Sequence, residues 1–365
     1  MKKSIKRVLS LFLICILLLQ CVACNKATVS NESTKNVENE ETQNIISNTR
    51  IFVDSLGREI TLPINIDRVA ITGPLAQIVC FPICADKLVG IANEWDKNAK
   101  EYFQEKYYNL PLLGQLYGGK GELNLETLLK YAPNVIIDVG ESKKGMTEDL
   151  DKLQNQIGIP FVHIDATLAK MDETYTILGE LLNMKEEAKV LSDYCKETYD
   201  RALNLSNTVE KKNVLYCLGQ TGLNVIAENS YFSEVFDLLC NNVAKIDNPS
   251  SKGSGNEIDA EQLLKWNPDY IFFAPDSIYD TVEDNVIWDS INAIKNKNYY
   301  KVPASPYNIF GFPPSVQRML GLTWCMYTLY PENCDFDIRD EFKKFYQMFY
   351  HANLTDEMLD KILYK

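Results

Sequence analysis

The sequence predicts an α/β protein of two similar lobes, each with a mostly parallel sheet flanked by helices, joined by a long helix. Three observations lead to this prediction. Short apolar runs alternate with helical patterns along most of the 365 residues, and one segment recurs later in the chain. Between its two copies lies a stretch without proline in which small and apolar residues recur at helical spacing. We expect a ligand cleft between the lobes.

The composition is that of a globular protein with an acidic surface. Hydrophobic residues make up 46% of the chain and charged residues 24%, which excludes a largely disordered or fibrous protein. The net charge of −13 argues against a nucleic-acid partner, because such a partner requires a basic surface. The two histidines, His163 and His351, leave little scope for a multi-histidine zinc site, and we expect neither a metal site nor a cofactor.

The N-terminal segment is interpreted as an export signal, 1–23. Four basic residues and no acid precede an apolar run, 8–19, which is too short for a membrane span of roughly 20 residues. The run ends in LLLQCVAC, which resembles a bacterial lipobox, and the small Ala23 before Cys24 suits cleavage there. The departure is Cys21, since the pattern usually has Leu, Val or Ile at that place. Lipidation of Cys24 is expected, and a plain secretion signal or an uncleaved anchor remain the alternatives.

Residues 24–50 are predicted to form a flexible tether, because they are polar and contain no aromatic residue. Seven cysteines follow this tether. Their odd number and scattered positions argue against a disulfide framework, and Cys80 and Cys84 are interpreted as buried free thiols on a helix.

The first lobe is expected over residues 51–170. Apolar runs and helical spacing predict its elements in chain order. They are a strand at 68–73, a helix at 75–85, a strand at 88–92, a helix at 125–131, and strands at 135–138 and 161–165.

The connecting segment, 171–207, is predicted to be helical apart from a joint near Asn183. One buried stripe is expected on it, made of Ala188, Leu191, Cys195, Thr198, Ala202 and Leu205. The second lobe, 208–365, is predicted to follow the same alternation. Its elements are strands at 213–218 and 223–227, a helix at 230–239, strands at 270–274 and 299–302, a helix at 314–330 and a helical tail.

The internal repeat pairs LNLETLLKYAPNVII at 123–137 with IDAEQLLKWNPDYIF at 258–272, an offset of 135 residues. Each copy is interpreted as a helix cap (Asn124 or Asp259), a helix, a proline stop and a strand. The identical pairs are Glu126/Glu261, Leu128/Leu263, Leu129/Leu264, Lys130/Lys265, Pro133/Pro268 and Ile136/Ile271.

These segments resemble the substrate-binding proteins of iron-siderophore, haem and cobalamin ABC importers, the helical-backbone class. The likeness covers about residues 50–365 and includes IFVDSLGREITLPINIDRVAITG, both copies of the repeat, SYFSEVFDLLCNNVA, FGFPPSVQRMLGLTWCMYTLYPE and LTDEMLDKIL. The resemblance implies two Rossmann-like lobes joined by a rigid helix. It also implies that Glu126 and Glu261 dock onto arginines of the permease, although carboxylates in a first helical turn also favour the helix dipole.

The resemblance implies a non-enzymatic, monomeric receptor, lipid-anchored to the outer face of a bacterial cell membrane. The receptor would capture an iron complex of siderophore or haem type and deliver it to a permease dimer with its ATPase. In such clefts the contacts come from loops at strand ends. Trp95, Tyr117, Tyr231 and Tyr307 are candidate aromatic walls, and Lys120 and Arg318 are candidates for meeting an anionic chelate. The alternatives are packing for the aromatic residues, solvation for Lys120 and an exposed helix face for Arg318.

Two other functions remain open. The same receptor could bind molybdate, tungstate or a corrinoid. A metal-dependent oxidoreductase is the more remote alternative, because no histidine lies with cysteine or clustered acids at ligand spacing, and no GxSxG motif is present. His163 lies within the apolar FVHID segment and is expected to belong to the core.

Overall fold

The strands of the first lobe form an antiparallel hairpin and a small parallel sheet. The computed structural model describes residues 48–117, 122–250, 252–311 and 313–363, and residues from Thr49 onward form one compact unit. The signal, 1–23, and nearly all of the tether, 24–50, lie outside the described residues. The hairpin pairs β1 (Thr49–Val53) with β2 (Glu59–Pro63), and the sheet has the order β3 (Val69–Ile71), β4 (Val135–Gly140), β5 (Phe161–Asp165).

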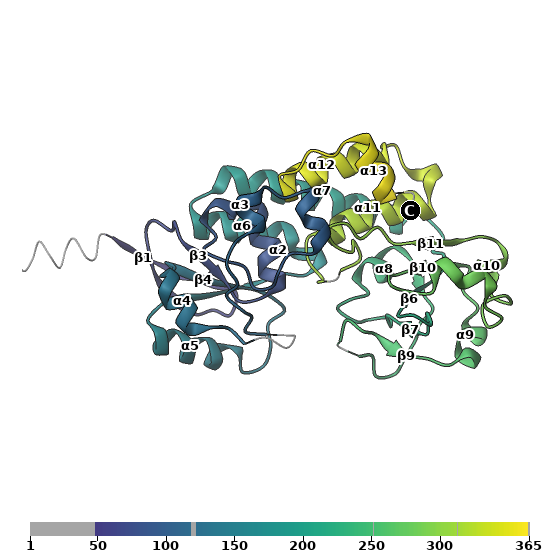
Figure 1. Ribbon diagram of the computed structural model, residues 1–365, viewed down its shortest axis with the longest axis horizontal. Helices are drawn as coiled ribbons and strands as arrows, with labels where there is room; N and C mark the ends of the chain where they lie inside the picture. Colours follow the sequence, from purple (N-terminus) through teal and green to yellow (C-terminus); the bar gives the residue numbers. More distant parts are fainter. Residues whose placement is uncertain (1–47, 118–121, 251, 312, 364–365) are drawn as a thin grey trace, which may run out of the picture. The chain divides into compact units, whose positions relative to one another are not determined.

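Within the described residues, four helices accompany this sheet, together with short 3-10 turns (Figure 1). They are α2 (Pro74–Cys84), α3 (Glu105–Tyr108), α4 (Leu125–Tyr131) and α5 (Met146–Ile157), with turns at Ala85–Lys87, Lys97–Glu101 and Leu168–Lys170.

The strand predicted at 88–92 is wrong. Its buried residues contribute only isolated bridges, one between Leu88 and Val69 and one between Ile91 and Leu112. A side chain at Gly90 would meet the Pro111 carbonyl oxygen at 2.6 Å, so this segment packs closely without extended pairing. The apolar run at 88–92 therefore indicates a buried segment and not a strand.

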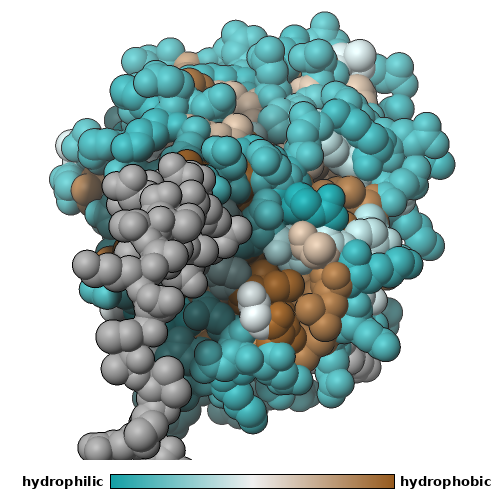
Figure 2. Space-filling model, turned by 90° about the vertical axis from the view of Figure 1, so that its left-hand side faces the viewer, coloured by the Kyte–Doolittle hydropathy of each residue, from teal (hydrophilic) through white to brown (hydrophobic). Residues whose placement is uncertain are grey.

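The hairpin of the first lobe presents apolar residues outward. Ile51 and Val53 of β1 are 61% and 58% exposed, whereas Phe52 between them is buried. Figure 2 shows that apolar residues gather in one area of this end of the molecule, on an otherwise hydrophilic face.

The second lobe has a mixed sheet of six strands in the order β11-β10-β6-β7-β9, with β8 pairing with β6. Its pairs β10–β11, β10–β6 and β6–β8 are parallel, whereas β7 is antiparallel to both of its neighbours. The strands are β6 (Asn213–Leu218), β7 (Asn224–Val225), β8 (Asn241–Asn242), β9 (Asn256–Glu257), β10 (Tyr270–Phe273) and β11 (Tyr299–Lys301). The strand predicted at 223–227 therefore shrinks to two residues.

Six α-helices and two 3-10 turns complete this part of the described chain. They are α8 (Glu234–Leu239), α9 (Ala260–Trp266), α10 (Asn292–Lys295), α11 (Gln317–Leu329), α12 (Ile338–Tyr350) and α13 (Asp356–Leu363), with turns at Tyr279–Asp284 and Pro331–Asn333.

Two helices begin later than predicted. Residues 230–233 form a turn in place of the start of α8, because the Ser233 hydroxyl donates to the Ser230 carbonyl oxygen at 2.8 Å and its oxygen accepts from the Ser230 amide. The helix predicted at 314–330 begins at Gln317, whose side-chain amide donates to the Pro313 carbonyl. In both places the chain forms a loop instead of a helix, on the side of the second lobe that faces the first lobe.

The connecting segment is a helical hairpin and not one rod. Helix α6 (Met171–Leu182) ends at Asn183, which has φ +55°, and α7 (Lys185–Ser206) runs back along it, with the Ser192 hydroxyl donating to the Asp172 carbonyl oxygen at 2.9 Å. A Cβ at Gly179 would lie 2.4 Å from the Ala188 Cβ, so only glycine permits this approach. Helix α7 alone, about 33 Å long at 1.5 Å per residue, passes from one lobe to the other.

The stripe predicted on α7 is largely confirmed. Ala188, Leu191, Cys195, Thr198 and Ala202 are buried. Leu205 is wrong as a buried member, since it lies half-buried at the last turn, and Tyr194 is an additional buried residue.

One apolar core runs through both lobes, with buried side chains from α2, α6, α7, α8, α11 and α12. The late helix α12 packs on α2 of the first lobe. The Phe81 ring lies 5.4 Å from that of His351, and the Phe103 ring 5.7 Å from that of Tyr350. Helix α7 is therefore not the sole connection between the lobes.

The two repeat copies fold alike. Asn124 and Asp259 cap α4 and α9 by accepting from the backbone amides three residues later, at 2.9 and 2.7 Å. Both helices end in a left-handed residue with φ +40°, Ala132 or Asn267, before the proline and the parallel strand. The predicted helix–proline–strand unit is confirmed in both lobes.

The Gly179 contact generates a stability prediction. Gly179→Ala should lower the free energy of unfolding by about 1–3 kcal/mol, because the added methyl group must push α6 from α7. Urea denaturation followed by circular dichroism measures this change. Glu180→Ala, at the exposed neighbouring position, should change the free energy by less than about 0.5 kcal/mol, and an equal loss in both variants would contradict the packing argument.

Candidate functional site

A cavity of about 700 Å³ lies between the lobes at the carboxyl ends of β3 and β4. We call it the aromatic cavity. Its walls come from residues 72–75 and 138–141 of the first lobe and from residues 229–232 of the second, with Tyr117 and Pro314 at its sides. Because the carboxyl ends of parallel strands leave a crevice at the sheet edge, the fold places loop residues here without burying a strand.

Tyr117 forms one wall of this cavity, and its hydroxyl group is available to donate a hydrogen bond. Its hydroxyl is buried and has no hydrogen-bond partner among the described residues. Burial raises the pKa of Tyr117 to about 12, with the negative charge of Asp138 adding to the effect, so the phenol stays protonated. The Lys143 ammonium lies 5.8 Å from the centre of the Tyr117 ring and brings a positive charge to the same wall.

Tyr231 forms the opposite wall and bridges the lobes. Its hydroxyl donates to the Ala166 carbonyl oxygen of the first lobe at 2.8 Å, and burial raises its pKa to about 12. The guanidinium carbon of Arg318 lies 4.8 Å from the centre of the Tyr231 ring, and Nη1 of Arg318 donates to the Tyr231 carbonyl oxygen at 2.9 Å. The wall is therefore held by contacts on both of its sides.

Arg318 is fully buried behind this wall and pairs with the Glu234 carboxylate. That carboxylate also accepts from the Leu168 amide of the first lobe at 3.3 Å. Two further nitrogen atoms of Arg318, Nε and Nη2, are buried without a hydrogen-bond partner among the described residues. Buried donors of this kind cost free energy unless they are paired, so they favour an acceptor close to the wall.

The floor of the aromatic cavity carries a charge pair. Asp138 accepts from the Thr72 hydroxyl and lies 2.6 Å from Nδ1 of His163, whose Nε2 lies 3.1 Å from Asp165. Burial alone would lower the pKa of His163, but the hydrogen bonds and charges of the two aspartates outweigh it and raise the pKa. The raised pKa favours the charged form of His163 beside the two aspartates, and His163 is a buried residue, as the sequence predicts.

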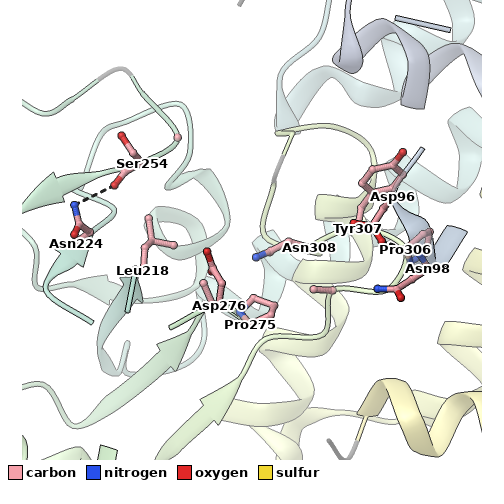
Figure 3. A pocket seen from close by; sticks show the side chains of 14 residues that line it. Asp96, Asn98, Leu218, Asn224, Ser254, Pro275, Asp276, Pro306, Tyr307 and Asn308 are labelled. Carbon is pink, nitrogen blue, oxygen red and sulfur yellow. Dashed lines mark hydrogen bonds between the residues drawn. The ribbon is translucent and has the colours of Figure 1, made fainter. Parts of the chain in front are cut away.

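A second cavity of about 640 Å³ lies at the carboxyl ends of β6, β10 and β11 (Figure 3). We call it the acidic cavity, because Asp96 and Asp276 line it while no lysine or arginine does so among the described residues. Figure 3 shows Asp96, Pro306 and Tyr307 together on one side of it, and Leu218 on the other. This cavity offers carboxylate and amide oxygens and favours neutral or cationic groups.

The predicted site residues are divided between these places. Tyr117 and Tyr231 line the aromatic cavity, and Tyr307 lines the acidic one. Trp95 lines neither, because its indole N–H donates to the Tyr107 carbonyl oxygen at 2.9 Å within the core. Arg318 lies behind Tyr231, Glu126 and Glu261 are exposed, and Lys120 and Cys24 lie outside the described residues.

Three residues of the site were not predicted from the sequence: Asp138 and Thr72 at the floor of the aromatic cavity, and Glu234, which pairs with Arg318 behind Tyr231. Asp138 closes the apolar strand VIID and Thr72 follows RVAI, so both carried a signal as polar residues at strand ends. Glu234 carried none, because its partner Arg318 is far away in the sequence. Within the described ranges, no group of three or more His, Cys, Asp or Glu side chains is arranged to hold a metal ion.

The His163 pair predicts a pH dependence. Its folded-state pKa lies above the ordinary value of 6.5, so its stabilising contribution is complete below about pH 6.5 and is lost as pH rises through the folded-state pKa. His163→Gln should lower the free energy of unfolding by about 3 kcal/mol near pH 6 and flatten its decline above that pH. Urea titrations across the neutral range measure both effects.

The control is His351→Asn, at an exposed residue with φ +53° that asparagine tolerates. This variant should leave the decline with pH in place. A decline that persists unchanged in His163→Gln would contradict the charge pair.

Comparison with known proteins accords with this architecture. The model of the periplasmic binding protein family matches residues 83–306. A solved ABC transporter solute-binding protein from Sulfurospirillum deleyianum is 28% identical, covers 86% of this chain and 98% of its own, and has a TM-score of 0.77. A periplasmic solute-binding protein from Veillonella parvula is 26% identical, with coverages of 87% and 97% and a TM-score of 0.72.

A third structure, the periplasmic protein MolA of Haemophilus influenzae bound to molybdate, is 20% identical, with coverages of 84% and 99% and a TM-score of 0.65, and supports the fold alone. Comparison with curated proteins gives no significant match. No helix in the described part of the chain has the length and apolar character that crossing a membrane requires. The resemblance noted in the sequence is confirmed, and the chain belongs to the periplasmic binding protein family, the extracytoplasmic solute receptors that work with the permease and ATPase of ABC importers.

Proposed function

We propose that this receptor captures a ferric chelate of siderophore type in the aromatic cavity, without turnover, and delivers it to its permease. The observation that carries the proposal is a cavity of about 700 Å³ bounded by Tyr117, Tyr231 and Phe232. Pockets of roughly 300–1,000 Å³ with aromatic walls suit organic ligands of drug size. A bare oxyanion such as molybdate would leave most of this volume to water.

The aromatic rings of the cavity and the cation beside Tyr117 support a ligand with flat anionic groups, although Glu141 also lines the cavity. The carboxylate of Asp138 is hydrogen-bonded to His163, which reduces its repulsion of an anion. Lys143 supplies a positive charge beside Tyr117, and the buried guanidinium of Arg318 supports the opposite wall. Flat catecholate or porphyrin groups could stack on these rings while their acceptors meet the Tyr117 hydroxyl.

The delivery step is proposed to use the two repeat helices. Glu126 and Glu261 lie in the first turns of α4 and α9, are exposed, and have no ion-pair partner within the described residues. Three residues after each of them lies a half-exposed leucine, Leu129 at 51% and Leu264 at 49%. Each lobe therefore exposes one glutamate and one leucine on its repeat helix. Two such matching surfaces suit a partner with two equivalent subunits, such as a permease dimer. The receptor would act as a monomer, lipid-anchored through Cys24.

Ligand binding tests the first part. Titration with a ferric tris-catecholate complex should quench tryptophan fluorescence, and Tyr117→Ala should weaken binding about tenfold, because one stacked ring contributes about 1.4 kcal/mol. Tyr327→Ala, at an exposed position on α11, should leave the affinity unchanged. Binding of molybdate, tungstate or cobalamin at one equivalent, with no response to ferric complexes or haem, would overturn the iron assignment.

Solute uptake by cells tests the second part. The double variant Glu126→Lys, Glu261→Lys should reduce uptake at least about tenfold, since it replaces both acidic contacts by repulsive ones. Affinity for the solute in solution should not change. The matched control is Glu173→Lys, another exposed first-turn glutamate on α6, which should support normal uptake. Normal uptake by the double variant would exclude the docking role.

A further inference from the structure

We propose that Cys240 and Cys325 form a disulfide that ties α8 to α11 in the second lobe. Their sulfur atoms lie 3.9 Å apart, and both side chains are buried. Cys240 is the residue that ends α8, and Cys325 lies within α11. The thiols already face each other across two different elements, so a bond between them needs only a small approach.

The pair lies on a helix contact that matters for the aromatic cavity. Helices α8 and α11 pack on each other, and Glu234 at the start of α8 pairs with Arg318 near the start of α11. Cys240 follows Glu234 by six residues and Cys325 follows Arg318 by seven, so the two contacts occur in the same order along both helices. The disulfide would therefore secure one end of the helix pair whose other end supports Tyr231.

The other close pair of cysteines would not stabilise the fold in this way. Cys80 and Cys84 lie one turn apart on α2, and the Cys84 thiol donates to the Cys80 carbonyl oxygen at 3.2 Å. A link there would close a ring of five residues and restrict the unfolded chain little. The 240–325 link would close a loop of more than 80 residues, which removes far more freedom from the unfolded chain.

The reaction is a thiol–disulfide exchange with an external disulfide, either oxidised glutathione or a thiol oxidase, which an extracytoplasmic protein can meet. One cysteine thiolate attacks the external disulfide and releases one thiol. The second thiolate then attacks the mixed disulfide and releases the other thiol. The two cysteines lose two electrons and two protons, and the two external sulfurs accept them. Burial raises the pKa of Cys325, so the exchange belongs to folding, before the thiols are enclosed.

The test compares the full chain refolded in oxidised and reduced glutathione with the chain refolded in dithiothreitol. After oxidative refolding, the alkylated protein should carry two labels fewer, and peptide mapping should find Cys240 linked to Cys325. The melting temperature should rise by at least about 5 °C relative to the reduced protein.

Cys240→Ala and Cys325→Ala should each abolish both effects, and Cys80→Ala should retain them. Each variant is compared with its own reduced form, so a general loss of stability does not affect the result. Full labelling of the cysteines after oxidation, a link to a different cysteine, or a temperature shift that persists in Cys240→Ala would each overturn the proposal.

Discussion

The packing of α7 and α12 across both lobes is the constraint on which the cleft depends. Helix α7 buries one stripe against α6, α8 and α11, and α12 brings Tyr346 and Tyr350 onto Tyr102 and Phe103 of the first lobe. Each buried aromatic side chain contributes about 1.5–3 kcal/mol, so separating the lobes would cost several times that amount. The buried contacts across both lobes therefore resist a change in the distance between the two sheet edges.

The polar groups of the aromatic cavity are oriented by partners outside it. His163 and Thr72 hydrogen-bond to Asp138. The guanidinium of Arg318, which pairs with Glu234, packs on the Tyr231 ring. Since these partners are buried, they hold these polar groups in place, and the proposed ligand would require little reorganisation of the cavity, which lowers the cost of binding. The interlobe contacts of Tyr231 and Glu234 also make the cavity sensitive to the relative position of the lobes.

Features that depend on neighbours along the chain could be predicted from the sequence. The caps of α4 and α9, the helix break at Asn183 and the apolar strands β4, β5, β6 and β10 are of this kind, because local hydrogen bonds or continuous burial specify them. The segment at 88–92 shares the apolar composition of a strand but lacks partners for its backbone.

Features that depend on distant neighbours could not be predicted. The enclosure of Trp95 by Phe81 and Phe103, and the return of α12 to α2, arise from packing between remote segments that no local pattern encodes. For the same reason, the sequence pointed to Tyr117, Tyr231 and Arg318 as candidate site residues but not to Glu234, which pairs with Arg318 behind Tyr231.

The return of α12 to the first lobe has a consequence for the order of folding. The rings of Phe81, Phe103 and Tyr102 are covered by residues 346–351, which a ribosome adds more than 240 residues after Phe103. A nascent chain that lacks these residues leaves the three rings uncovered, so its first lobe is completed only after most of the second lobe has been made.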